Sequence, residues 1–186
     1  MGKKEKYDLT ISHYTKIIKS NPKDYRAYNN RGNAFQLKGH YDLSINDYNK
    51  SIELNPKFDL PYINGGNAYQ KKGQYDLSIN DYNKAIELNP GNSMAYNNRG
   101  FIFILIGKFE ETEKDIQKAL ELNPDNIFAL NSMSELYAAK NDPAEACKWL
   151  SKAIEKGYIN WNYIKTSKTY TTIRNSSCFK TIIFGK

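Results

Sequence analysis

The chain has few of the residues on which catalysis and metal binding usually depend. Its 186 residues include only two cysteines and two histidines. Cys147 and Cys178 do not make a disulfide framework or a metal site, and neither His13 nor His40 lies in a catalytic or metal-binding motif. No glycine-rich phosphate-binding loop occurs either. We therefore expect no enzymatic activity, no cofactor and no metal ion.

Long hydrophobic runs are missing as well. The longest, from Phe101 to Ile106, has six residues, whereas a helix that crosses a membrane needs about 20. The basic residues near the N-terminus are not followed by an apolar stretch, as they would be in a secretory signal. Together with the low cysteine content, these absences predict a cytoplasmic protein that does not enter a membrane.

Most of the chain has no excess of charge, although the net charge is +7. Residues 25–155 carry 15 basic and 17 acidic residues, and residues 156–186 carry six basic residues and no acidic one. A nearly neutral middle argues against nucleic acid bound along it. The basic tail, which also contains tyrosine and tryptophan, keeps nucleic-acid binding as the least favoured alternative.

What the sequence does contain is self-similarity at a constant period. Proline, glycine and tyrosine recur every 34 residues. They stand at Pro22, Pro56, Pro90 and Pro124, at Gly32, Gly66 and Gly100, and at Tyr28, Tyr62 and Tyr96. The segment 75–90 differs from 41–56 only in having Ala85 in place of Ser51. A constant period of about 34 residues is typical of stacked helical hairpins.

The repeated unit resembles the tetratricopeptide repeat, whose pattern is a large aromatic residue, Leu-Gly, Tyr, Ala, Phe and a closing Pro. The corresponding residues here are Tyr28, Arg31-Gly32, Phe35, Ser44, Tyr48 and Pro56. The resemblance implies an all-α, right-handed solenoid (a superhelix) of antiparallel helix-turn-helix repeats with a helical C-terminal cap.

We divide the chain into a repeat array and a cap. The array, residues 1–157, consists of a half repeat 4–24, full repeats 25–58, 59–92 and 93–126, and a degenerate repeat 127–157. Asp24 and Asp59 are expected to cap first helices, and Gly39 to end one. The capping segment, residues 158–186, resembles the end segment of bacterial proteins of this family, and Ile173, Phe179, Ile182, Ile183 and Phe184 are expected to pack on the last repeat.

The segment 4–20 matches the second helix of a repeat whose first helix is absent. Its apolar side, made by Tyr7, Ile11, Tyr14, Ile17 and Ile18, is expected to be half covered. Three explanations stay open: the chain is part of a longer protein, another molecule covers this helix, or the helix is the N-terminal cap.

Two sets of contacts are predicted within the helix pairs. A glycine in the middle of a helix costs about 1 kcal/mol relative to alanine. Its recurrence therefore indicates that a large residue of the second helix needs the space, and these residues are Tyr48, Tyr82 and Ile116. Arg31 precedes Gly32 on the first helix, and Asp47 precedes Tyr48 on the second, so the two side chains are expected to touch. The same spacing pairs Arg99 with Asp115.

By the resemblance, the first helix of each repeat lines a concave groove that binds peptides. The predicted binding residues are Asn30, Asn33, Ile63, Asn64, Asn67, Gln70, Met94, Asn98, Phe101, Ile104 and Leu105. Asn30, Asn64 and Asn98 either pair with a peptide backbone or bridge neighbouring helices. The apolar residues Phe101, Ile104 and Leu105 either bind a partner or lie under the tail. Phe128, Asn131 and Glu135 are the corresponding residues of the fourth repeat.

The predicted function is a protein–protein interaction scaffold that binds a peptide segment of a partner protein. The cations with which some family members clamp the carboxylate of a chaperone tail are missing, because their positions hold Asn29 or Ile63, Met94 or Phe128, and Asn98 or Ser132. The main alternative is a self-assembly module that stacks end to end, as a homodimer through residues 4–20.

Overall fold

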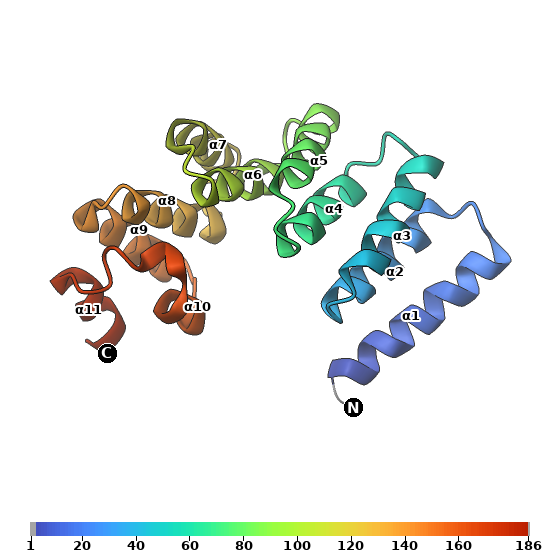
Figure 1. The fold of residues 1–186 in the computed structure, drawn as a ribbon, viewed down its shortest axis with the longest axis horizontal. Helices are drawn as coiled ribbons and strands as arrows, with labels where there is room; N and C mark the ends of the chain where they lie inside the picture. The colour runs from blue at the N-terminus through green and yellow to red at the C-terminus, as the bar shows by residue number, and fades with distance from the viewer. Residues whose placement is uncertain (1–2, 186) are drawn as a thin grey trace. The chain divides into compact units, whose positions relative to one another are not determined.

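The computed structural model describes residues 3–185, which form helices joined by short turns (Figure 1). The helices are α1 (Lys3–Ser20), α2 (Tyr25–Leu37), α3 (Tyr41–Leu54), α4 (Leu60–Lys71), α5 (Tyr75–Leu88), α6 (Ser93–Leu105), α7 (Phe109–Leu122), α8 (Ile127–Ala139), α9 (Pro143–Glu155), α10 (Trp161–Thr166), the 3₁₀ helix η1 (Lys168–Tyr170) and α11 (Ser177–Phe184). No strand occurs in the described part of the chain. The predicted all-α fold class is confirmed.

The chain forms two compact units that divide after Pro90. In the first unit, α2 packs against α3 and α4 against α5, while α1 packs on α2 and α3 on α4. In the second unit, α6 pairs with α7 and α8 with α9, and η1 and α11 pack on α8 and α9. Each unit is thus built from helix hairpins that bury their shared faces, as expected when one repeat cannot cover its own apolar side.

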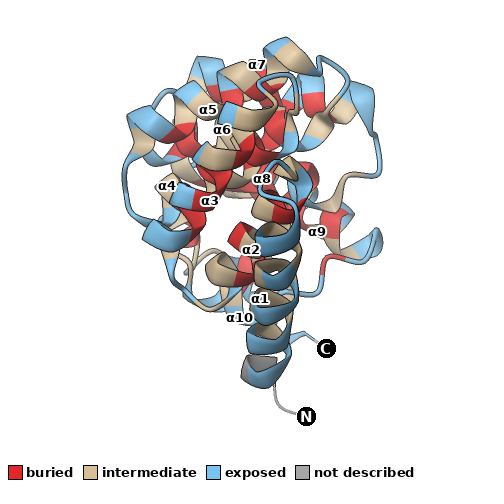
Figure 2. Cartoon of the chain, turned by 90° about the vertical axis from the view of Figure 1, so that its right-hand side faces the viewer, coloured by how far each residue is buried: buried red, intermediate tan, exposed pale blue. Residues whose placement is uncertain are grey.

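Helix α1 is the least buried of the long helices. None of its residues from 5 to 20 is buried, whereas α2, α3 and α4 of the same unit each carry buried positions (Figure 2). The sequence of α1 is that of a second helix, and its main contact is with α2. The predicted half coverage of residues 4–20 is therefore confirmed.

The mid-helix glycines do leave room for large side chains of the paired helix. A Cβ atom on Gly32 would lie 2.7 Å from a ring carbon of Tyr48, and one on Gly66 would lie 2.6 Å from Tyr82. Ser78 is small for the same reason, and its hydroxyl donates a 2.8 Å hydrogen bond to the carbonyl oxygen of Gly66. These contacts bring the two helices of a repeat close together and fix their register.

The turns between paired helices depend on a residue in the left-handed region. Gly39, Gly73 and Gly107 take this conformation with φ of 82°, 73° and 77°, and Asn141 takes it in the fourth repeat with φ of 58°. Glycine and asparagine are the residues that adopt this conformation at least cost. Asp24 caps α2 as predicted. Asp59 is the N-cap residue of α4 as predicted, but its side chain makes no capping hydrogen bond and instead accepts one from Asn89.

The predicted pairs of arginine and aspartate are also present. Arg31 donates two hydrogen bonds to the carboxylate of Asp47, at 2.8 and 2.7 Å, and Arg99 makes the same pair with Asp115. These are the bidentate pairs that the planar guanidinium group favours. In the fourth repeat, Trp149 packs against the cluster that contains Met133.

The prediction that the two cysteines make no disulfide is wrong, because Cys147 on α9 and Cys178 on α11 form one. Their sequence separation is 31, and Cys178 lies in the tail that no longer follows the repeat period. Disulfides persist mainly in oxidising compartments. The cytoplasmic location therefore stays a prediction, and this bond weighs against it.

The tail packs on the last repeat, with one exception to the prediction. Ile173 and Phe179 are buried in a cluster with Leu150 of α9, and Ile182 and Ile183 pack at its edge. Phe184 was expected to pack there too, but 76% of its surface is exposed. It is the last residue of α11.

Candidate functional site

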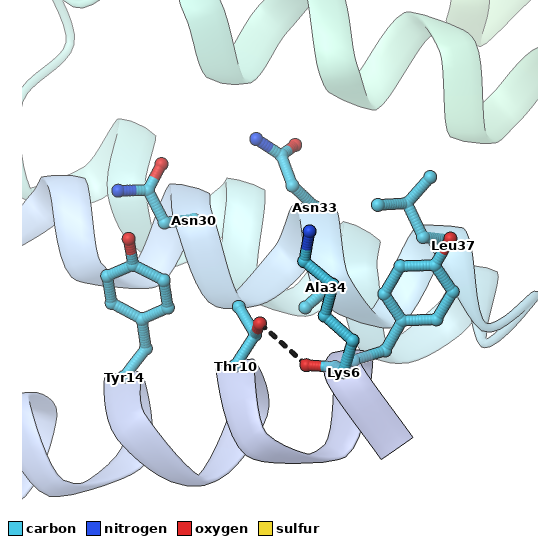
Figure 3. Close-up of a pocket in the computed structure, with 8 residues that line it drawn as sticks. Lys6, Thr10, Tyr14, Asn30, Asn33, Ala34 and Leu37 are labelled. Atoms are coloured by element: carbon cyan, nitrogen blue, oxygen red, sulfur yellow. Dashed lines mark hydrogen bonds between the residues drawn. The ribbon is translucent and has the colours of Figure 1, made fainter. Parts of the chain in front are cut away.

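The first unit has a pocket of about 430 Å³ between α1 and α2 (Figure 3). Its walls are side chains of α1, namely Lys6, Tyr7, Thr10 and Tyr14, and of α2, namely Asn30, Asn33, Ala34 and Leu37. Thr10 turns its hydroxyl to the carbonyl oxygen of Lys6, at 2.8 Å, so its methyl group is left for the pocket. The pocket therefore combines tyrosine rings and aliphatic groups with two carboxamides.

The repeat period explains why this pocket exists. Asn64 of α4 is the equivalent of Asn30 of α2, and its amide donates a 2.9 Å hydrogen bond to the side-chain oxygen of Asn29. The side of a first helix that carries this asparagine thus contacts the preceding first helix. Among the residues that the structure describes, no first helix precedes α2. The pocket beside Asn30 lies where one would pack.

Asn33 and Asn67 are held in place by tyrosines of the paired helices. The Tyr48 hydroxyl lies 2.8 Å from the side-chain oxygens of both Asn33 and Gln36, and the Tyr82 hydroxyl lies 2.7 Å from that of Asn67. Burial raises the pKa of Tyr48 strongly, so its hydroxyl stays protonated and remains a donor. Two successive repeats therefore present a carboxamide with a fixed orientation.

The row of asparagines is partly used within the protein. Asn64 bridges α4 to α2, while the side-chain oxygens of Asn30 and Asn98 accept longer contacts of 3.3 Å from the neighbouring Asn29 and Asn97. The helix-bridging alternative thus holds for Asn64. All three residues are half-buried, so part of each carboxamide still faces solvent.

The second unit has a pocket of about 530 Å³ between the first turns of α6 and α8. Of the predicted binding residues it contains Met94 and Asn98, and Phe128 of α8 also lines it. Met94 and Phe128 are 57% and 61% exposed. Exposed side chains of this size are the usual anchors of a docked peptide.

Two predicted binding residues lie in the core instead of on a surface. Ile63 is only 2% exposed and Ile104 only 6%. Ile104 belongs to a cluster with Ile116 and Met133, and Phe101 packs against that cluster. Of the predicted apolar patch, only Leu105 is exposed, and it is α7 and α8, not the tail, that cover the rest.

The tail covers the inner side of the fourth repeat. The carboxylate of Glu135 on α8 accepts hydrogen bonds from Tyr163 at 2.5 Å, Thr169 at 2.6 Å and Asn131 at 2.9 Å. Burial raises the pKa of Glu135 to about 7, and these three donors oppose the rise. Glu135 and Asn131 are therefore unavailable to a ligand. No sequence signal identified this cluster, because its partners come from the segment outside the period.

The described residues include no group of three or more His, Cys, Asp or Glu side chains that could hold a metal ion. Within the same residues, no helix is both long and apolar enough to cross a membrane. The arrangement offers carboxamides, tyrosine rings and exposed aliphatic groups, which suit the binding of a polypeptide.

Family models agree with this repeat architecture. Models described as tetratricopeptide repeat match residues 25–58, 93–126 and 47–80, and one described as TPR repeat matches residues 66–107. Together they cover residues 25–126 without a gap, which is more than half of the chain. None of the curated proteins matches the sequence.

Solved structures show the same fold. MamA is similar over 84% of this chain and 95% of its own, with 24% identity and a TM-score of 0.70. YrrB, described as a TPR protein with an unusual peptide-binding site, has 21% identity over 89% of this chain and 86% of its own, with a TM-score of 0.65. The first TPR of Spaghetti (RPAP3), bound to the HSP90 peptide SRMEEVD, has 29% identity over 62% of this chain and 92% of its own, with a TM-score of 0.60.

The repeat period, the glycine contacts within each helix pair and the matches to family models and structures all lead to one assignment. The chain belongs to the tetratricopeptide repeat family.

Proposed function

We propose that this protein is a protein–protein interaction scaffold whose first helices bind a peptide segment of a partner protein. The observation that carries the proposal is the pair of oriented carboxamides, Asn33 and Asn67, at the same position in two successive repeats. Each is fixed by a tyrosine hydroxyl of the paired helix. A carboxamide has both a donor and an acceptor, so it can pair with a peptide backbone whatever the peptide's side chains are.

Each unit, taken by itself, exposes apolar side chains that can anchor a peptide. Leu37 is exposed beside Asn33 in the first unit. Met94 and Phe128 are exposed in the pocket of the second. We propose that a few apolar side chains of the partner supply most of the affinity there, as in other interfaces. Ile63 and Ile104 play no part in this proposal because they are buried.

The comparisons support peptide binding in general. YrrB is described as having a peptide-binding site, and the similar domain of Spaghetti (RPAP3) is described in complex with a peptide. The peptide SRMEEVD in that complex is acidic, whereas Asn29, Met94 and Asn98 stand here at the positions where related proteins carry cations. We therefore propose a peptide that is recognised along its backbone, not by a terminal carboxylate.

The test is a peptide selected on the full protein from a displayed random library, followed by measurement of its Kd. The double variant Asn33→Ala/Asn67→Ala is expected to weaken binding at least tenfold, because each lost hydrogen bond contributes about 1 kcal/mol. The matched control is Asn46→Ala/Asn80→Ala, which removes two exposed carboxamides from α3 and α5 at the same spacing. Equal affinity of the two double variants would refute the proposed surface.

A second candidate function, self-assembly, is favoured by the pocket between α1 and α2. Its lining residues Tyr7, Tyr14 and Leu37 leave apolar surface where the first helix of a repeat would pack. In this alternative, a second copy of the chain occupies the pocket between α1 and α2. Sedimentation over a wide concentration range would then give a dimer that Tyr14→Glu removes and Ser12→Glu, on the exposed side of α1, does not. A monomer at every concentration would rule it out.

A further inference from the structure

The arginine of the first full repeat lies in a site made of two rings and a carboxylate. The guanidinium carbon of Arg31 lies 5.6 Å from the ring centroid of Tyr28 and 5.9 Å from that of Phe35. Its nitrogens donate to both oxygens of the Asp47 carboxylate, and a third donates to the Thr15 hydroxyl at 3.3 Å. The side chain of Asp47 is buried under this group.

The third repeat contains the same arrangement, two repeats further on in the sequence. The guanidinium carbon of Arg99 lies 5.8 Å from the ring centroid of Tyr96 and 5.9 Å from that of Phe103. The pair with Asp115 has donor–acceptor distances of 2.7 and 2.6 Å. The same chemistry in two repeats shows that this combination of rings and carboxylate holds a guanidinium group well.

The second repeat keeps every part of this site except the arginine. Tyr62 and Tyr69 of α4 occupy the two ring positions, and Asp81 of α5 occupies the carboxylate position, but Gly65 stands where the arginine would be. A Cβ atom on Gly65 would lie 2.6 Å from Oδ2 of Asp81, so the carboxylate points into the place of the missing side chain.

The Asp81 carboxylate acts electrostatically on both rings. Burial raises the pKa of Tyr62 and of Tyr69, and the charge of Asp81 raises each further. No cation among the described residues pairs with Asp81. Asp81 is half-buried, whereas Asp47 and Asp115 are buried. The carboxylate is thus partly shielded from water, where an ion pair is stronger, and exposed enough for a cation to reach it.

A further acceptor stands at the edge of the site. Asn49 of α3 is the equivalent, one repeat later, of Thr15, and Thr15 is the residue to which Arg31 gives its third hydrogen bond. The side chain of Asn49 lies within hydrogen-bonding reach of Tyr69. Helices α3, α4 and α5 of one unit therefore surround the position of the missing group, and α4 packs against both neighbours.

We propose that Tyr62, Tyr69 and Asp81 form a receptor site for a guanidinium group, supplied by an arginine side chain of a partner protein. The planar group would stack on the two rings and donate two parallel hydrogen bonds to the carboxylate. A lysine ammonium group cannot make this bidentate pair, so the site selects arginine. The proposal is independent of the peptide surface on the first helices, because it uses none of that surface's residues.

Propylguanidinium, which is the arginine side chain without its backbone, is the direct probe. Calorimetric titration of the full chain is expected to show one saturable site, with binding at least tenfold weaker in Asp81→Asn and for propylammonium. Gly65→Arg should abolish binding because its own arginine fills the site. Unsaturable binding, or equal binding to Gly65→Arg, would overturn the proposal. Guanidinium compounds also weaken folding in general, and Gly65→Arg measures that contribution.

A gain of function makes the test independent of any loss of folding. Arg31→Gly leaves Tyr28, Phe35 and Asp47 in place, and it should raise the stoichiometry for propylguanidinium from one to two. A second probe, N-acetylarginine amide, tests whether the guanidinium group comes from an arginine of a polypeptide, because it carries a peptide backbone. Its binding supports an arginine of a partner protein. Binding of propylguanidinium alone overturns that source and leaves a small guanidinium compound as the ligand.

Discussion

Asp81 is a carboxyl group at a position where the equivalent residues of two other repeats bind a cation. Its two equivalents each accept a bidentate arginine, whereas Gly65 leaves Asp81 without one. Burial consequently raises the pKa of Asp81 from 3.8 to about 7. A difference of a single side chain between repeats thus changes the electrostatics of the helix pair, although the backbone plan is the same.

The stability of the protein should depend on pH through this residue. Because the pKa in the folded state is raised, its contribution is full below pH 3.8 and is lost as the pH rises through about 7. Asp81→Asn is therefore expected to change the free energy of unfolding little at pH 4 and to raise it by roughly 1–3 kcal/mol at pH 8. Denaturant unfolding at both values measures this, and an equal effect at pH 4 and pH 8 would contradict it.

At the arginine–aspartate pairs, in contrast, removal of a charged side chain is expected to lower the stability. Arg31→Leu leaves the buried Asp47 carboxylate without its cation and should lower the free energy of unfolding by roughly 3 kcal/mol. Arg31→Leu/Asp47→Leu should recover much of that loss, since well-packed apolar residues often replace a buried ion pair without cost. Thermal and denaturant unfolding of the two variants measure the difference. A double variant no more stable than the single one would show that the pair itself stabilises the fold.

At the scale of elements, the tail is attached to the last repeat in two ways. Tyr163 of α10 and Thr169 of η1 donate to the buried Glu135 carboxylate of α8. The disulfide between Cys147 and Cys178 joins α9 to α11. The tail thereby closes the inner side of α8, which the repeat pattern alone would have left open to ligands.

Removal of the disulfide should loosen α11. A cross-link over a sequence separation of 31 stabilises the folded state by about 3–4 kcal/mol in the chain-entropy model. Cys147→Ser/Cys178→Ser, or the wild type with a reductant, is therefore expected to lose amide-exchange protection in α11 and to melt at a lower temperature. A reductant should leave the double variant unchanged. Full protection of α11 in the reduced wild type would show that the apolar contacts of Phe179 suffice.

At the scale of the whole molecule, stability in an array of repeats is a sum over repeats and their contacts with immediate neighbours. Damage to one repeat should consequently stay local. Gly66→Ala places a methyl group 2.6 Å from the Tyr82 ring, and such overpacking costs about 1–3 kcal/mol. Amide exchange is expected to lose protection in α4 and α5 and to change little in α9. Equal losses in all helices would indicate a single cooperative unit instead.

The sequence by itself determined the helix hairpins, their turns and the contacts within each pair. A constant repeat period compares each position with its own copies, so Gly32, Gly66 and Gly100 reveal where a partner side chain needs space. The same comparison placed Arg31 opposite Asp47 from residue types alone. The hairpins, turns and paired contacts all form between residues within one repeat. A comparison of repeat copies can therefore predict them.

Only the tertiary structure decided which of these residues a ligand can reach. Ile63 and Ile104 share a helix with exposed residues, yet neighbouring helices bury them. The disulfide and the Glu135 cluster join the tail to α9 and α8, about one repeat earlier in the chain. The tail has no second copy in the sequence, so no internal comparison could reveal its partners. Its contacts follow from the apolar surface that the last repeat leaves uncovered, which exists only once the hairpins have packed.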